Sequence, residues 1–298
     1  MSRRSTLQTF KNWAVYRALR IFAAMARRLP LSLGRGAGSS LGLLAHAVVR
    51  RERAKALRNI AVAFPEKTDR ERRRIIRDTF IHLGRSLFEI CWLPNLNAPR
   101  MSRSTTFEGL ENMKAAVAEK RGVVLFTGHC GNWEWMAAAI ALSGFDMNVI
   151  ARELYDPRIN DFVVKSRAQF GVRSIGRGSS ASAREILQTL KGGSILGVLI
   201  DQNIKAEGAE VPFFGKPAFT PTGPAKLAIR AGAVAIAGFI ERQGDRQIVR
   251  FESPVITSRS DDAVALTTQM TSAIENHIRR VPSQWVWMHD RWKNRSRK

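Results

Sequence analysis

Residues 123–134 read VVLFTGHCGNWE: an apolar run, a glycine, a histidine and, five positions after the histidine, a glutamate. An apolar run of this kind next to glycine predicts a buried strand. Side chains that follow such a strand lie at the carboxyl edge of the sheet, where α/β proteins place reactive groups. Gly131 permits a tight turn, and Asn132 is a good N-cap for a helix that begins at Trp133. The stretch therefore predicts a strand–turn–helix unit with a histidine in its turn.

His129 and Glu134 are the candidate catalytic pair of this unit. On one continuous helix, side chains five positions apart are rotated by about 500° and point well apart. They meet if His129 lies in the turn and Glu134 lies in the first turn of the following helix, where the helix dipole keeps a carboxylate ionised. Such a carboxylate fixes the imidazole tautomer and stabilises the imidazolium formed when the ring takes a proton. We expect Glu134 to orient His129, which acts as a base on a substrate hydroxyl.

Strands and helices alternate along the second part of the chain. We expect strands near residues 105–107, 123–127, 147–151, 172–175, 194–200, 234–240 and 247–252. We expect helices near residues 110–119, 133–142, 157–170, 182–190, 224–231 and 262–280. This alternation predicts an α/β fold with a mostly parallel central sheet flanked by helices. An amino-terminal helical, membrane-associated section over residues 1–100 and an α/β domain over residues 101–298 are expected to form one globular unit.

A basic helix and a second helix with a capping box are expected in the amino-terminal section. Residues 50–63 predict a helix that stops before Pro65, and Thr68 with Glu71 forms a capping-box pattern for a helix to about Cys91. Residues 95–103 are rich in turn formers and predict a linker. The section is therefore mostly helical.

The charge of the chain restricts its partners. Against 25 Asp and Glu there are 48 Lys and Arg, a formal net charge of +23. Such a charge favours a nucleic acid, an anionic bilayer, an acidic carrier protein or a phosphorylated lipid as partner. Two cysteines, Cys91 and Cys130, do not make a disulfide framework and indicate a reducing, cytoplasmic setting.

Residues 7–28 predict an amphipathic helix. Arg17, Arg20 and Arg27 gather on one side of a helical wheel, and apolar and aromatic residues occupy the remainder. This pattern is typical of a helix that lies in a bilayer interface, although an ordinary surface helix has the same charged face. No uncharged apolar run reaches the roughly 18 residues of a membrane span. We expect peripheral binding by amphipathic amino-terminal helices.

Several short motifs compete with the His129 turn. Residues 38–42 match the serine hydrolase pattern G-x-S-x-G but lack the strand that should precede it. Residues 176–181 match a dinucleotide-binding pattern, G-x-G-x-x-A. Cys130 is a second potential nucleophile, and His289 is a reserve base. The tryptophan-rich residues 283–292 suit a bilayer interface, a nucleic-acid stack or the edge of the core.

Six blocks of the sequence resemble one enzyme family. The blocks are NIAVAFPE (59–66), TGHCGNWE (127–134), AR (151–152), DQ (201–202), VPFFG (211–215) and QWVWMHDRWK (284–293). In this order they resemble the late acyltransferases of lipid A biosynthesis, within the wider lysophospholipid and glycerophosphate acyltransferase superfamily. The resemblance covers most of the chain and implies a glycerophosphate-acyltransferase-like fold.

The resemblance also implies a reaction. It implies transfer of a fatty acyl group, usually from acyl carrier protein, to a hydroxyl of an anionic lipid acceptor at the cytoplasmic face of the inner membrane. The HX4E motif maps onto His129 and Glu134, and further family blocks map onto Arg152, Asp201 and Gln202. No acyl-enzyme is expected, since His129 activates the acceptor directly. Backbone N–H groups near Gly131 or the Arg152 guanidinium are candidate oxyanion donors.

The substrate-binding candidates are Asn132, Arg152, Asp201 and Gln202, and neither a cofactor nor a metal is expected. A lipid A precursor is the favoured acceptor. A lysophospholipid or glycolipid acyltransferase that uses acyl-CoA has the same chemistry. A basic nucleic-acid-binding protein is the alternative from another class, and an oxidoreductase using Gly176 and Gly178 is a third. We do not expect a nucleic acid as partner, because the sequence contains no recognised nucleic-acid-binding motif.

Overall fold

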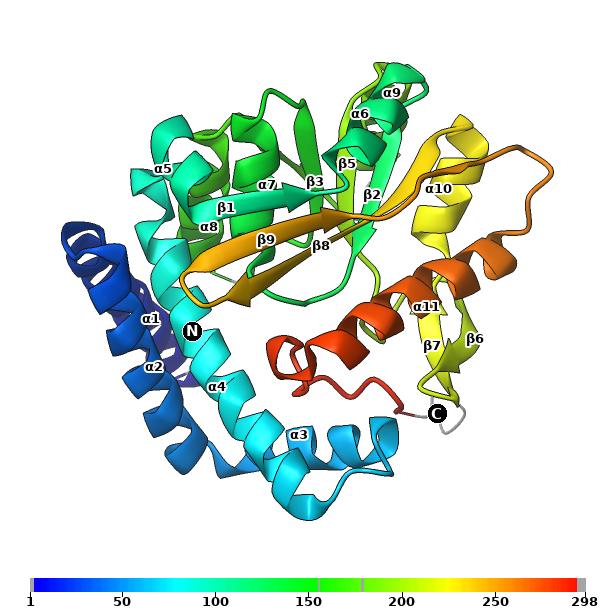
Figure 1. The fold of residues 1–298 in the computed structure, drawn as a ribbon. Helices are drawn as coiled ribbons and strands as arrows, with labels where there is room; N and C mark the ends of the chain where they lie inside the picture. Colours follow the sequence, from blue (N-terminus) through cyan, green and yellow to red (C-terminus); the bar gives the residue numbers. More distant parts are fainter. Residues whose placement is uncertain (1–2, 155, 178–179, 294–298) are drawn as a thin grey trace.

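The computed structural model describes residues 3–154, 156–177 and 180–293, and its centre is an eight-stranded sheet (Figure 1). The strand order is β1-β9-β8-β2-β5-β3-β4, and β10 pairs with β8. The strands are β1 (Thr105–Glu108), β2 (Val123–Thr127), β3 (Met147–Ala151), β4 (Arg173–Gly176), β5 (Ile195–Leu199), β8 (Val234–Gln243), β9 (Arg246–Phe251) and β10 (Val255–Ile256). From β8 through β2, β5 and β3 to β4 all pairs are parallel, and β1 is parallel to β9. Antiparallel pairs join β8 to β9 and to β10. The expected mostly parallel sheet is confirmed.

Strand β2 lies in the middle of the sheet and is buried along its whole length. Its side chains alternate: Val124 and Phe126 join one hydrophobic cluster, while Val123 and Leu125 join the other. Helices cover both faces, as expected for a parallel sheet. This explains why the strand reads as a continuous apolar run and why its last residues present a turn at the sheet edge.

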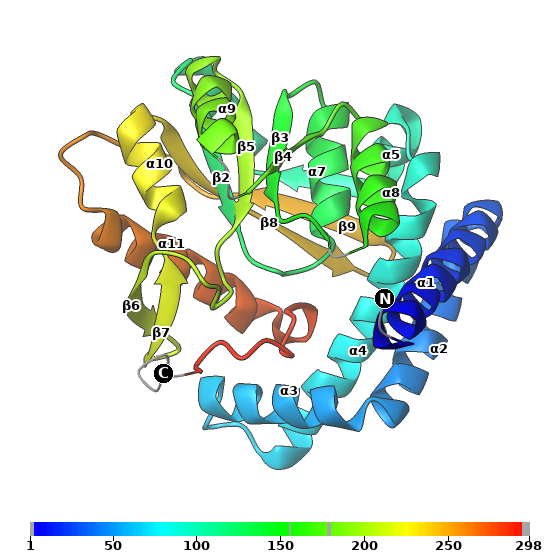
Figure 2. The same ribbon diagram turned by 180° about the vertical axis from the view of Figure 1, so that it is seen from behind.

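Helices from two parts of the chain form the outer layers (Figure 2). One cluster includes buried residues of α9 (Ser180–Lys191), α10 (Gly223–Ala231) and α11 (Ala263–Arg280). The other includes α6 (Leu110–Ala118) and α7 (Trp133–Leu142), with Phe162 of α8 (Pro157–Ala168) packed against it. All six helices were expected from the sequence within two residues or so at each end.

The amino-terminal section consists of α1 (Arg3–Arg28), α2 (Leu31–Val48), α3 (Arg50–Ala63) and α4 (Asp69–Trp92). Thr68 and Glu71 form the expected capping box at the start of α4. Helix α4 contributes Ile76 and Phe80 to one core cluster and Phe88 and Cys91 to the other. Because α4 packs into both clusters, the section is continuous with the α/β part. None of the described helices combines the length and the apolar character that a membrane span requires.

Residues 38–42, the hydrolase-like motif, lie inside α2 and not in a strand-to-helix turn. Their glycines allow α2 and α4 to touch. A Cβ on Gly42 would lie 2.2 Å from the Phe80 carbonyl oxygen, and a Cβ on Gly84 would lie 2.1 Å from the Gly38 carbonyl oxygen. The motif is a helix-packing surface, so the serine hydrolase alternative is wrong.

One hairpin and three short helices were not expected. A hairpin of β6 (Gly208–Phe213) and β7 (Lys216–Pro221) forms a separate two-stranded sheet, and its turn holds Phe214 and Gly215 at positive φ. Its strands contain three prolines and lack clear alternation, which hides them from pattern analysis. The short helix η1 (Leu93–Asn95) ends where the expected linker begins, α5 (Ala98–Ser104) takes up most of that linker, and η2 (Pro282–Gln284) follows α11.

Candidate functional site

The turn after β2 is held in place by the carboxyl-terminal segment. Gly131 has φ +60°, and a Cβ there would lie 2.0 Å from the Ile240 carbonyl oxygen, so glycine is needed for both reasons. Its N–H donates to the Gln284 carbonyl at 2.8 Å, and the His129 carbonyl accepts from the Val286 N–H at 3.2 Å. The Gly131 N–H is therefore used inside the protein, so among the backbone N–H groups near Gly131 that were candidate oxyanion donors this one is already bonded.

His129 is hydrogen-bonded to Asp201. Its Nδ1 lies 2.7 Å from Asp201 Oδ1, and its backbone N–H donates to Asp201 Oδ2 at 2.7 Å. Trp285 Nε1 donates to the same Oδ2 at 2.7 Å. Asp201 follows β5, the strand beside β2, so two parallel strands bring the residues together at one edge. The His129 side chain remains 20% exposed, while that of Asp201 is fully buried.

The Asp201 carboxylate is ionised. Burial alone would raise its pKa, but the charge of His129 and the hydrogen bonds from His129 and Trp285 outweigh burial and hold the pKa below its usual value. An ionised partner at Nδ1 requires Nδ1 to carry the proton, which leaves Nε2 as the basic nitrogen. This is the arrangement of an imidazole general base.

Gln202 lies between two histidines. Its Nε2 is 2.9 Å from His129 Nε2 and 2.6 Å from His289 Nε2, and the two rings are 5.4 Å apart. Burial, followed by the nearby charge of His129, lowers the pKa of His289, which favours a neutral ring. Asn59 of α3 holds this segment by donating to the carbonyls of Trp287, at 2.7 Å, and His289. His289, a reserve candidate in the sequence, thus belongs to the same site.

Glu134 does not bind His129. It lies in the first turn of α7, as expected, but its two oxygens accept from Arg167 Nε at 2.8 Å and Arg167 Nη2 at 2.5 Å. Trp133 instead packs against His129, with ring centroids 5.1 Å apart. The expectation that Glu134 orients His129 is therefore wrong: the start of α7 directs Glu134 toward α8, and Asp201 has the orienting position. That Glu134 takes part in catalysis in some other way stays a prediction.

Asn132 is the expected N-cap and is only 1% exposed. Its Oδ1 accepts from the Trp135 N–H at 3.1 Å, and its Nδ2 donates to Glu89 Oε2 at 3.0 Å. These bonds position the turn, and a side chain this buried presents no surface to a substrate. The expectation that Asn132 binds substrate is not supported by this placement.

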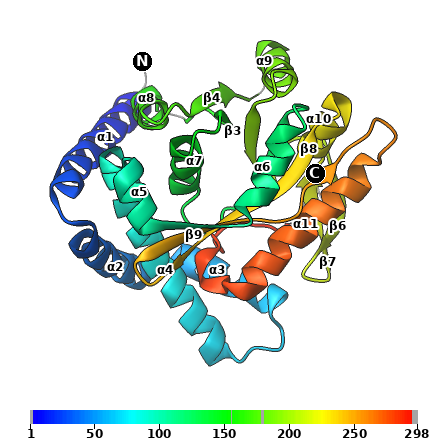
Figure 3. The same ribbon diagram turned by 45° about the horizontal axis from the view of Figure 1, so that its top comes forward.

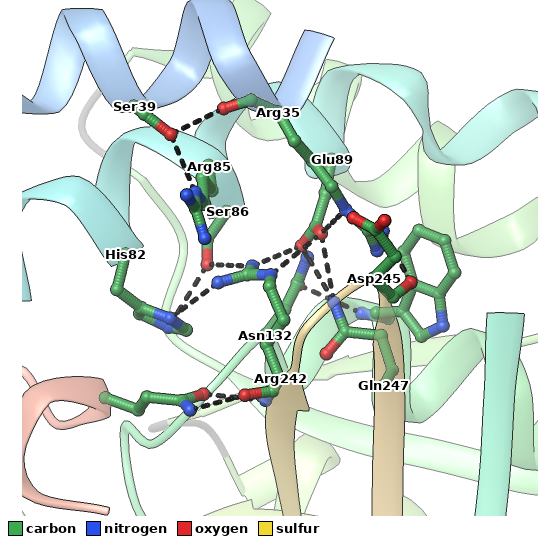
Figure 4. Close-up of polar contacts among 12 residues, drawn as sticks. Arg35, Ser39, His82, Arg85, Ser86, Glu89, Asn132, Arg242, Asp245 and Gln247 are labelled. Carbon is green, nitrogen blue, oxygen red and sulfur yellow. Dashed lines mark hydrogen bonds and ion pairs between the residues drawn. The ribbon is translucent and has the colours of Figure 1, made fainter. Parts of the chain in front are cut away.

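Asn132 belongs to a buried charged network around Glu89, drawn in Figure 4. The Glu89 carboxylate accepts from Arg35 Nε at 2.7 Å, Arg242 Nη2 at 2.6 Å and Gln247 Nε2 at 3.0 Å. Burial raises the pKa of Glu89, but the charge of Arg242 and these hydrogen bonds outweigh it and lower the pKa. The network joins α2, α4, the β8–β9 hairpin and the cap of α7.

A second connection runs from this network to the turn. The Arg242 backbone N–H donates to Gln284 Oε1 at 2.8 Å, and Gln284 Nε2 donates to the Arg242 carbonyl at 2.9 Å. Gln284 is the residue whose carbonyl accepts from the Gly131 N–H. Helix α4 is thus joined to the turn at Asn132 directly and at Gly131 through Arg242 and Gln284. Sequence patterns gave no sign of this support, since its members are spread over the whole chain.

Two cavities adjoin α7 beside the turn. Arg152, at the end of β3, lines a polar cavity of about 260 Å³ together with Glu134, Glu153 and Arg167. A narrower, mainly apolar cavity of about 40 Å³ lies between α7 and strands β2, β3 and β5. Its walls include Trp133, Met136, Met147, Val149, Gly197 and Val198. Glu134 and Arg167 line both cavities, so this ion pair stands where a polar space meets an apolar one.

The remaining sequence candidates can be placed. Cys130 is buried, and burial raises the pKa of its thiol far above the usual value, so it is not an activated nucleophile. Trp285 and Trp287 are buried in the core and not stacked on the surface. Residues 176–181 lie partly outside the described residues. Among the described residues no group of three or more His, Cys, Asp or Glu side chains is arranged to hold a metal.

Comparison with known proteins identifies the family of this chain. The family model of the bacterial lipid A biosynthesis acyltransferases matches residues 2–294. The lipid A biosynthesis palmitoleoyltransferase of Escherichia coli (strain K12) is 27% identical over 268 residues, covering 87% of this chain and 84% of that protein. The phosphatidylinositol mannoside acyltransferase of Mycobacterium tuberculosis (strain CDC 1551 / Oshkosh) is 25% identical over 216 residues, covering 70% of this chain and 67% of that protein.

One solved structure, the 1-acyl-sn-glycerophosphate (LPA) acyltransferase PlsC from Thermotoga maritima, aligns with 86% of this chain and 99% of its own. Its identity is 12% and its TM-score is 0.42. The fold assignment rests on the sheet order given above. The match of the family model over nearly the whole chain confirms the family expected from the sequence. The chain belongs to the bacterial lipid A biosynthesis acyltransferase family and is a lipid acyltransferase.

Proposed function

We propose that the protein transfers a fatty acyl group from the thioester of acyl carrier protein to a hydroxyl of a lipid A precursor, with His129 as the general base. The observation that carries the proposal is the 2.7 Å contact between His129 Nδ1 and the buried, ionised Asp201. It leaves Nε2 as the basic nitrogen on a partly exposed ring.

The reaction follows from this geometry. His129 Nε2 takes the proton of the acceptor hydroxyl, and the oxygen attacks the thioester carbonyl carbon. The tetrahedral intermediate collapses as the C–S bond breaks, and the thiolate takes the proton back from the imidazolium. Asp201 stabilises that imidazolium while it exists. The products are the new ester and the free thiol, and no acyl-enzyme forms.

Gln202 is the candidate oxyanion donor. Its Nε2 lies within hydrogen-bonding distance of Nε2 of both His129 and His289, so its N–H groups are already beside the reacting nitrogen. The incoming hydroxyl displaces the amide from His129, and the amide then faces the reacting carbonyl. Arg152 lines the same cavity as Glu134, and the proposal assigns its guanidinium to a phosphate of the acceptor.

The apolar cavity beside Trp133 supports an acyl substrate. It runs from the level of Thr127 toward Gly197 between α7 and the sheet, and most of its lining is hydrocarbon. Trp133, whose ring packs against His129, lines this cavity, so the proposal assigns the cavity to a fatty acyl chain whose carbonyl lies at His129. Entry of the chain requires the Met136 and Met147 side chains to move, which flexible methionines permit.

Peripheral binding at the cytoplasmic side of the inner membrane is part of the proposal. Large apolar side chains are exposed on helices α1 and α2, among them Ile21, Met25, Leu33, Leu44 and Val48. Cations of α1 flank them, which suits an anionic bilayer. The net charge of +23 also suits an acidic carrier protein.

Purified protein tests the proposal directly. It should transfer a radiolabelled acyl chain from acyl carrier protein to a lipid A precursor in mixed micelles. Acyl-CoA is run in parallel as donor, and a lysophospholipid or a phosphatidylinositol mannoside as acceptor. The last acceptor is included because a phosphatidylinositol mannoside acyltransferase also matches this chain. Faster transfer to another acceptor would overturn the lipid A assignment. Lipid mass spectrometry of a deletion strain identifies the missing acyl chain in the cell.

A further inference from the structure

A cavity of about 380 Å³ lies between α1 and α8, away from the His129 turn. Figure 3 shows the two helices side by side at one edge of the molecule. Helix α1 lines the cavity with Tyr16, Arg20, Ala23, Ala24 and Arg27, and helix α8 lines it with Asp161, Phe162, Lys165, Ser166 and Gln169. Neither the sequence motifs nor the proposed reaction uses this space.

Helix α8 separates this cavity from the proposed acceptor site. Lys165, Ser166 and Gln169 line the α1 side, whereas Asn160, Val163 and Arg167 line the polar cavity that contains Arg152 and Glu134. The two sets alternate along one helix because residues three and four apart share a face. The α1–α8 cavity is therefore a distinct site.

The charge of the side chains that line the cavity favours an anionic ligand. Three cations, Arg20, Arg27 and Lys165, face one carboxylate, Asp161. Lys165 Nζ is 2.8 Å from Asp161 Oδ2, so the carboxylate is matched by one of the three. Arg27 Nε donates to the Cys91 carbonyl at 3.5 Å, which ties its guanidinium to the protein. A forked guanidinium held in this way suits phosphate oxygens.

The rest of the lining suits the remainder of a lipid headgroup. Ser166 and Gln169 offer neutral hydrogen-bonding groups for a glycerol or other polyol. Ala23, Ala24 and Phe162 give an apolar wall on which an adjoining acyl chain can lie. The lining therefore combines the three chemistries of a glycerophospholipid: a phosphate, a polyol and hydrocarbon.

Large apolar side chains are also exposed on helix α1, outside the cavity. Ile21 is 62% exposed and Met25 is 58% exposed, and neither lines the cavity. Apolar side chains on a helix that also carries cations bring that helix, and the cavity that it lines, to the headgroup level of a bilayer. We propose that the α1–α8 cavity binds the phosphate headgroup of an anionic membrane glycerophospholipid that is not a reactant. This inference rests on the proposed membrane association and is independent of acyl transfer.

The test uses a monomeric lipid, so that general attraction to a charged surface plays no part. Binding of dihexanoyl phosphatidylglycerol below its micelle concentration is measured by calorimetry on the full chain. The same titration with dihexanoyl phosphatidylcholine and with inorganic phosphate separates a lipid headgroup from a free anion. Phosphatidylglycerol should bind at least about tenfold more tightly than either, since one charged hydrogen-bonded contact accounts for about that factor. Equal binding of inorganic phosphate would overturn the lipid as ligand.

Two double variants with the same loss of charge test whether the lipid binds in this cavity. Arg20→Gln with Lys165→Gln removes two cations of the cavity, while Arg17→Gln with Arg28→Gln removes two cations of α1 outside it. The first should weaken phosphatidylglycerol binding by at least about tenfold, and the second by less than about twofold. Equal weakening in both would reject the site.

A third variant keeps every charge. Ala24→Trp fills the cavity from an exposed position of α1 and should abolish binding while the melting temperature stays unchanged. Undiminished binding by this variant would contradict the proposal. His129→Ala should bind the lipid as the wild type does, so a failure of the proposed acyl transfer and a failure of this inference give different results.

Discussion

Asp201 stands 72 residues after His129 in the chain, yet its carboxylate lies 2.7 Å from His129 Nδ1. Glu134, only five residues away, is bound to Arg167 instead. Chain proximity and spatial partnership therefore differ within one motif. The parallel pairing of β2 with β5 brings the distant carboxylate to the histidine, and the first turn of α7 carries the nearby one away. Asp201 and Glu134 are thus expected to contribute differently to activity.

Substitution of the two carboxylates separates their roles. Asp201→Asn keeps the shape but loses the charge that stabilises the imidazolium, so we expect kcat to fall by roughly 10²–10⁴-fold. Glu134→Gln breaks the ion pair with Arg167 and should lower the melting temperature, with a fall in kcat of less than about tenfold. Steady-state kinetics and thermal unfolding of both variants check this. A Glu134→Gln enzyme of normal stability and no activity would contradict the assignment.

Gly131→Ala should destabilise the protein more than the same change elsewhere. The new Cβ meets the Ile240 carbonyl at 2.0 Å and the residue has φ +60°, so backbone must move. We expect a loss of about 3 kcal/mol in the free energy of unfolding. Gly144→Ala is the matched control, since φ there is +89° but a Cβ meets nothing within 4 Å, and about 1 kcal/mol should be lost. Urea denaturation measures both, and equal losses would show that the turn is not held as described.

Two buried histidines should make stability fall in mild acid. Burial, with the charge of Arg242, lowers the pKa of His82 to about 3, and burial, with the charge of Arg280, lowers that of His277 to about 3. Between about pH 6.5 and 3 the unfolded chain binds protons at these residues and the folded protein does not, so stability decreases as pH falls. From pH 7 to 5 each histidine should account for roughly 2 kcal/mol.

Urea denaturation at pH 7 and at pH 5 measures this decrease, and His277→Gln provides the comparison. The variant lacks one of the two groups, so its loss of stability between the two pH values should be smaller than that of the wild type by roughly 2 kcal/mol. Identical losses in the two proteins would mean that His277 titrates normally in the folded state.

The apolar cavity predicts a change in acyl-chain preference. A Cβ on Gly197 would lie 2.6 Å from Met147 Cε and would narrow the cavity from its floor. Gly197→Ala should therefore lower kcat/KM for the longest accepted chain by about tenfold relative to a chain two carbons shorter. Gly223→Ala, where a Cβ meets nothing within 4 Å, should leave the ratio unchanged. A donor series of acyl carrier proteins gives the ratios, and an unchanged profile in Gly197→Ala would place the chain elsewhere.

Local patterns predicted much of the fold, because apolar runs, caps and glycine turns act within a few residues. The β2–α7 unit, the Thr68–Glu71 capping box and the helices that cover the sheet were all found in this way. The partner of His129 was not, since the order of strands in a sheet is not a local property. The sequence did draw attention to Asp201 and Gln202 through the family resemblance, but it assigned them to substrate and not to the base.

Glu89 and the Gly38–Gly42 pair also show that local patterns do not reveal contacts between distant segments. Glu89 reads as one charge on an amphipathic helix, and only tertiary packing reveals that Arg35 and Arg242 neutralise it in the interior. Gly38 and Gly42 match a catalytic motif by their spacing, but in the structure they let two helices approach. Residues whose role depends on distant segments were therefore missed or misread.

In the proposed reaction His129 is the base that acts on the acceptor hydroxyl. The most direct test is acyl transfer by purified His129→Ala from acyl carrier protein to the lipid acceptor, with folding checked by circular dichroism. The variant should fold and should turn over at least about a hundredfold more slowly than the wild type, as expected for the loss of a general base. A folded His129→Ala protein with a near-normal rate would contradict the account.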